Sequence, residues 1–76
     1  MKLRMPLSKT DRILALINYY LPTDDINRYH FQADSIAYNT RKNSSLKRIE
    51  ELVREYLQIE NEELIRQLAV EIKAML

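Results

Sequence analysis

Four cations surround a predicted helix N-terminus between residues 39 and 48. The segment NTRKNSSLKR contains no acidic residue. The first turn of a helix carries unpaired backbone N–H groups and a partial positive charge, so it favours anions over cations. A phosphate group bound there would meet backbone donors, hydroxyl groups and cationic side chains together. The candidate contacts for a nucleic acid or an acidic partner are Arg41, Lys42, Asn43, Ser44, Ser45, Lys47 and Arg48.

The same segment also has a purely structural interpretation. Lys and Arg are good helix formers, and salt weakens a dipole mismatch of about 0.3–1 kcal/mol. The net charge of +1 argues against a dedicated polyanion binder. The charge is nevertheless unevenly distributed. Residues 1–48 carry nine basic and four acidic side chains, whereas residues 49–76 carry three basic and seven acidic side chains. Pairing between the basic half of one copy and the acidic C-terminal helix of another is therefore a third alternative.

Two aromatic residues form a second candidate surface. Phe31 and Tyr38 are seven residues apart and share one side of a predicted helix, with polar neighbours beside them. Large rigid side chains of this kind dominate the energetics of protein interfaces. We expect a partner interface at Asn27, Phe31, Asp34 and Tyr38. There are two alternatives. The rings are buried within the monomer, or they stack on the bases of a single-stranded nucleic acid.

Residues suited to catalysis or metal binding are scarce. The chain has one histidine, His30, and no cysteine, so no serine has a recognisable base and no zinc site can be assembled. Asp24 and Asp25 are adjacent and diverge around a helix, and first-turn acids have a structural reason to be there. We expect no catalytic residue, metal ligand, cofactor or small-molecule substrate.

Composition limits the fold. The 76 residues are enough for one domain, 1–76, which would bury only about 60–65% of the surface of its unfolded chain. The chain contains no glycine, which disfavours tight hairpins and phosphate-binding loops. Asn39, Asn43 and Asn61 are the residues available for left-handed helix ends. Helix packing and self-association are the expected sources of additional stability.

The N-terminus and the hydropathy pattern bear on localisation. MKLRMPLSK has two early cations without the apolar run of a signal peptide, and no stretch reaches the roughly 18–20 apolar residues of a membrane span. The lack of cysteine fits a reducing compartment. We therefore expect a cytoplasmic protein that does not bind a membrane.

The elements that must position these residues are all helices. Caps and apolar spacing predict an all-α, compact bundle of three to four short helices at about 8–21, 23–39, 45–57 and 61–76. Ser8 caps the first helix, which is apolar on nearly every side and ends before Pro22. Thr23 caps the second, in which Ile26 is expected to face the core. Apolar and polar residues also alternate over 29–34, as they do in a β-strand, but no second segment of the sequence could pair with such a strand.

The third helix has the clearest amphipathic pattern, and it begins at about Ser45. We expect an ion pair between Glu50 and Arg54 on this helix, and a second between Glu62 and Arg66 on the fourth. Whether the third and fourth helices are separate or one bent rod is open from the sequence.

These features favour a non-catalytic protein-interaction module, such as an adaptor, inhibitor or regulator, that forms a homo-oligomer. Four short helices offer more apolar surface than one small core can bury, and the surplus lies on the nearly all-apolar first helix and on the side that carries Phe31 and Tyr38. The alternative is a nucleic-acid-binding regulator that contacts phosphates through residues 41–48.

Overall fold

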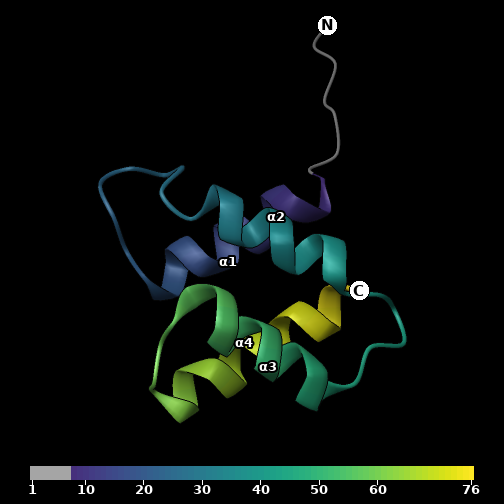
Figure 1. Ribbon diagram of the computed structural model, residues 1–76. Coiled ribbons are helices and arrows are strands. Elements are labelled where there is room, and N and C mark those ends of the chain that lie inside the picture. Colours follow the sequence, from purple (N-terminus) through teal and green to yellow (C-terminus); the bar gives the residue numbers. More distant parts are fainter. Residues whose placement is uncertain (1–7) are drawn as a thin grey trace, which may run out of the picture.

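The computed structural model describes residues 8–76, which form four helices. These are α1 (Lys9–Tyr20), α2 (His30–Asn39), α3 (Leu46–Leu57) and α4 (Glu62–Met75). Figure 1 shows α1 and α2 stacked on α3 and α4. Helix α1 packs against α2 and α4, and α3 packs against the same two helices. The predicted all-α bundle is confirmed, with α3 and α4 as separate helices. The segment MKLRMPL, on which the expectation about a signal peptide rests, lies outside the described residues.

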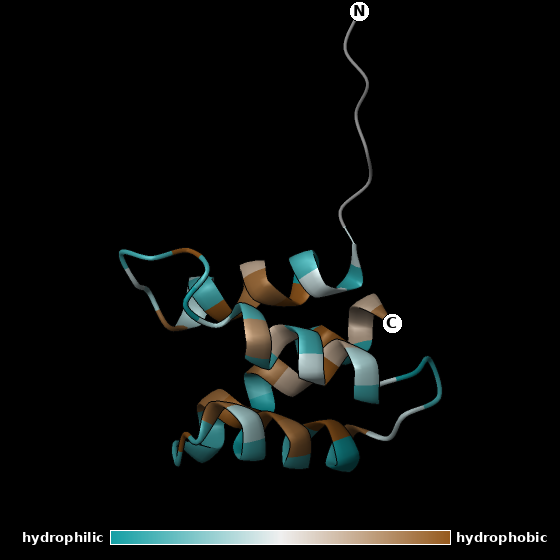
Figure 2. Ribbon diagram, turned by 45° about the horizontal axis from the view of Figure 1, so that its top comes forward, coloured by the Kyte–Doolittle hydropathy of each residue, from teal (hydrophilic) through white to brown (hydrophobic). Residues whose placement is uncertain are grey.

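Aliphatic side chains from all four helices fill the space between them. Figure 2 shows α3 with a hydrophobic side toward the other helices and a hydrophilic side away from them. Full burial of each Ile or Leu side chain is worth about 1.5–3 kcal/mol, so this core is the main source of stability. The buried hydrophobic residues are Ile13, Leu14, Ile17, Ala33, Ile36, Ala37, Ile49, Leu52, Val53, Ile65, Leu68, Ala69 and Ile72.

Side-chain caps begin three of the helices. The Ser8 and Ser45 hydroxyl oxygens accept from backbone N–H groups three residues later, each at 3.1 Å, as the sequence predicts. The Asn61 Oδ1 atom does the same for α4 at 3.1 Å. Asn61 therefore starts a helix, although the composition suggested that it would end one.

The second helix begins at His30, so the prediction of a start at residue 23 is wrong. The Thr23 Oγ1 atom accepts from the Asp25 N–H at 3.2 Å, and the Asp25 Oδ1 atom accepts from the Asn27 N–H at 3.0 Å. Such local hydrogen bonds compete with the helical pattern and hold the backbone in turns. Ile26, which was expected in the core, is 70% exposed in this loop.

The α3–α4 connection also differs from expectation. Arg54 pairs with Glu62 at 2.7 Å and Arg66 lies 3.8 Å from Glu50, so both arginines bridge the two helices. The predicted ion pairs within each helix do not form. The antiparallel packing of α3 and α4 instead places a carboxylate of the neighbouring helix beside each arginine.

A left-handed residue ends α3. Gln58 has φ 54° and ψ 43°, and its N–H donates to the Arg54 carbonyl at 2.9 Å. In the described part of the chain it is the one residue with positive φ, a role for which the sequence had suggested asparagines. Its Cβ makes this conformation cost about 1–2 kcal/mol more than it would for glycine.

Replacing Gln58 by glycine is expected to raise the free energy of unfolding by about 0.5–1 kcal/mol, because glycine adopts the left-handed conformation without strain. Urea unfolding followed by circular dichroism measures this change. The matched control is Gln67→Gly within α4, which should lower stability by a similar amount. A destabilised Gln58→Gly protein would contradict the account of this helix end.

Candidate functional site

The predicted aromatic surface lies largely on α2. Phe31 is 74% exposed and Tyr38 is 86% exposed, so neither ring is buried in the monomer. Asp34 lies between them and its Oδ1 atom accepts from the Thr10 hydroxyl at 3.0 Å, which ties α2 to α1. Asn27 does not share the helix face, because it belongs to the turn before α2. The structure therefore brings together three of the four predicted residues.

The predicted basic segment forms a compact loop and the first turn of α3. The Ser44 hydroxyl oxygen accepts from the Arg41 N–H at 2.8 Å, and the Ser44 N–H donates to the Arg41 carbonyl at 2.9 Å. Lys42, Asn43 and Lys47 are exposed. Arg48 is partly neutralised by Glu51 at 3.5 Å. The hydroxyl oxygens of Ser44 and Ser45 already accept backbone hydrogen bonds, so each would meet a phosphate as a donor.

Two further cations join this loop from distant parts of the chain. The Lys73 Nζ atom in α4 donates to the Ser44 carbonyl at 2.7 Å, and the Lys9 Nζ atom in α1 donates to the Thr40 carbonyl. Partial burial, and to a smaller extent the nearby Arg41, lower the pKa of Lys9. Sequence reasoning missed both lysines, because no local pattern links residues 9 and 73 to the loop.

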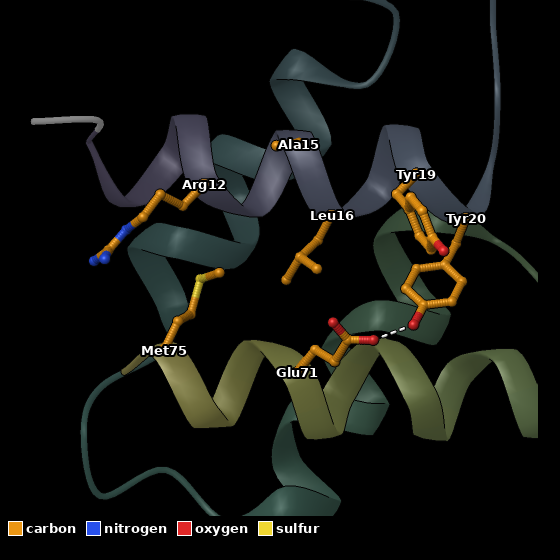
Figure 3. A pocket seen from close by; sticks show the side chains of 7 residues that line it. All are labelled: Arg12, Ala15, Leu16, Tyr19, Tyr20, Glu71 and Met75. Carbon is orange, nitrogen blue, oxygen red and sulfur yellow. Dashed lines mark hydrogen bonds between the residues drawn. The ribbon is translucent and has the colours of Figure 1, made fainter.

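A groove between α1 and α4 is the third surface, and the sequence did not identify it. Its volume is about 570 Å³. Figure 3 shows Arg12 and Met75 at one end, Tyr19 and Tyr20 at the other, and Leu16 and Glu71 between them, with the Glu71 carboxylate directed toward Tyr20. Ala15 completes the lining. The one sequence signal for this groove was the apolar character of α1 on nearly every side.

Hydrogen bonds hold the tyrosine end of the groove in place. The Tyr20 hydroxyl donates to the Glu71 carboxylate, which also accepts from the Gln67 Nε2 atom at 3.0 Å. The two donors lower the pKa of Glu71, and the bond to this carboxylate raises the pKa of Tyr20. Tyr19 stacks edge-to-face on Tyr20, with ring centroids 5.0 Å apart. A fixed carboxylate and two fixed rings thus face the groove.

The residues considered for catalysis are dispersed. His30 is exposed at the start of α2. Within residues 8–76, no three His, Asp or Glu side chains gather as a metal ion would require. None of the helices in this part of the chain has the length and apolar character needed to cross a membrane.

Comparisons with known protein families, curated proteins and solved structures find no match to this chain. The three surfaces described above are therefore the basis for assigning a function.

The bond between Tyr20 and Glu71 predicts a pH-dependent contribution to stability. A carboxyl pKa below 4.5 stabilises the fold above that pH, and this contribution is lost as the pH falls through the folded-state value. A tyrosine pKa above 10.0 stabilises the fold below pH 10.0, and this contribution is lost as the pH rises through the folded-state value. The Tyr20→Phe protein should therefore be less stable than wild type near neutral pH and approach it at both extremes.

Urea unfolding at acidic, neutral and alkaline pH tests this dependence. Tyr38→Phe is the control. The Tyr38 side chain is exposed, so loss of its hydroxyl group should change the free energy of unfolding little at any pH. A Tyr20→Phe deficit that stays constant across the pH range would show that the hydrogen bond is not its source.

Proposed function

We propose that this chain is a non-catalytic protein-interaction module whose main binding surface is the groove between α1 and α4. One observation carries the proposal. The groove is apolar, and Tyr19, which lines it, is 76% exposed. Concave surfaces with rigid aromatic side chains and a few fixed polar groups are typical binding sites.

The polar groups of the groove support binding rather than chemistry. The Glu71 oxygen that accepts from Tyr20 also accepts from Gln67, and both donors favour its charged form. A carboxylate held in this way fixes the orientation of a partner but offers no basic group near neutral pH. An adaptor, inhibitor or regulator fits this chemistry.

The aromatic residues of α2 supply a second contact region. Phe31 and Tyr38 are exposed, and they belong to α2, which does not line the groove. A module with two such regions can join two partners or two copies of itself. The lack of cysteine supports a cytoplasmic setting for this role.

A photoreactive amino acid at position 19 tests the proposed groove in cells that express the chain. We expect cross-linked adducts at position 19 and few at position 55, which is an exposed control site on α3. The cross-linked protein, once purified, should bind the Ala15→Glu variant about tenfold more weakly, because a charge enters the apolar groove. Equal adduct yields at both positions, or unchanged affinity of Ala15→Glu, would overturn the proposal.

A second candidate function is nucleic-acid binding through the basic loop. The observation that favours it is the convergence of Lys9 and Lys73 on the segment that already contains Arg41, Lys42 and Lys47. Tyr38 precedes this loop and is 86% exposed, so a stacking surface lies next to the cations in the chain.

A mobility shift at two salt concentrations tests this second function. Binding should weaken steeply with salt, and the variant with Arg41, Lys42, Lys47 and Arg48 all changed to alanine should lose at least about tenfold in affinity. The matched control replaces Arg12, Arg28, Arg54 and Arg66 by alanine, which gives the same net charge. Equal behaviour of the two variants would exclude a specific role for the loop.

A further inference from the structure

The two ends of the α1–α4 groove have complementary chemistry. One end presents the Arg12 guanidinium and the Met75 thioether, and the other presents Tyr19 and Tyr20, toward which the Glu71 carboxylate reaches from the middle of the groove (Figure 3). Arginine pairs with carboxylates and stacks on aromatic rings, and methionine sulfur also contacts aromatic rings favourably. Each end therefore carries the groups that the opposite end would bind.

Neither Arg12 nor Glu71 has an ionic partner within residues 8–76. The ion pairs of this part of the chain involve Arg48, Arg54 and Arg66, and none includes Arg12 or Glu71. The hydrogen-bond donors to Glu71 are the neutral side chains of Tyr20 and Gln67. These donors leave the carboxylate charged and fixed, so its position is determined before any partner arrives.

A two-fold rotation perpendicular to the groove exchanges its two ends. An axis near the middle of the groove can set Arg12 of one copy over Glu71 of the other, and the symmetry makes this contact twice. A surface that is complementary to itself in this way is what a symmetric dimer requires. Ala15 is small and exposed on the same wall, which permits close approach of a second helix.

We infer that the occupant of the groove is a second copy of this chain, related by a two-fold axis that sets Arg12 of each copy against Glu71 of the other. This inference rests on the proposed function and names the partner for that same groove. The resulting interface joins α1 and α4 of both copies. The aromatic residues of α2 lie outside it and stay open to another protein.

Charge reversal combined with analytical ultracentrifugation tests the inference on the whole chain. Wild type should dimerise reversibly across a dilution series. Arg12→Glu should raise the dissociation constant about tenfold, because two cross-interface pairs become repulsive. The double variant Arg12→Glu/Glu71→Arg should recover most of that loss. Arg28→Glu, the same charge change in the loop before α2, should leave the dissociation constant unchanged.

Disulfide trapping provides a second readout that does not depend on ion-pair strength. The chain has no cysteine, so Arg12→Cys and Glu71→Cys each introduce a single thiol. Mixed under oxidising conditions, the two variants should form a covalent heterodimer faster than a mixture of Glu71→Cys with Glu55→Cys, which places the thiol on the exposed side of α3. Circular dichroism melting curves confirm that each variant is folded.

The outcomes separate this inference from the proposed function. A wild-type chain that stays monomeric, a dimer indifferent to Arg12→Glu, or equal trapping in both mixtures would overturn the two-fold arrangement. If photo-cross-linking at position 19 still captures a different protein whose binding needs Ala15, the groove keeps its function with another occupant. If both experiments fail, the proposed function fails as well.

Discussion

Burial of aliphatic side chains between four short helices holds this chain together, because it contains no cysteine to form a disulfide. Each helix contacts two others, and the side toward them carries the Ile, Leu, Val and Ala residues that exclude water. In helix α1 the apolar surface extends beyond that side. Its excess, which includes Leu16 and Tyr19, reaches the surface beside α4 and lines the groove there. The groove is thus a consequence of how the core is formed.

The polar contacts depend on this core as well. Lys9 and Lys73 hold the two ends of the loop between α2 and α3, because the bundle brings the start of α1 and the end of α4 close to it. The same packing brings Tyr20 of α1 to Glu71 of α4. These contacts are peripheral, and they add less to stability than the core does. Their effect is to fix charged groups on the surface.

Local features of the sequence predicted the helices well where one cap and one apolar pattern agreed. Ser8 and Ser45 begin helices as expected, since a hydroxyl cap acts on N–H groups only three residues away. The predicted start of α2 was wrong because Thr23 and Asp25 can cap a helix or form a turn. In the structure their side chains hydrogen-bond within turns before α2. The ion pairs of Arg54 and Arg66 were misassigned because a carboxylate on a neighbouring helix cannot be identified from spacing along one helix.

The sequence by itself determined the all-α class, most helix limits and the core sides of α3 and α4. All of these follow from the periodicity of side chains around a helix and from contacts within a few residues. The tertiary structure alone decided which part of α1 remains uncovered, that Phe31 and Tyr38 are exposed, and that Arg12 and Glu71 line one groove. It also decided that Lys9 and Lys73 meet at one loop. Residues so far apart in the chain become neighbours only through the packing of whole helices, and no pattern along the chain records that packing.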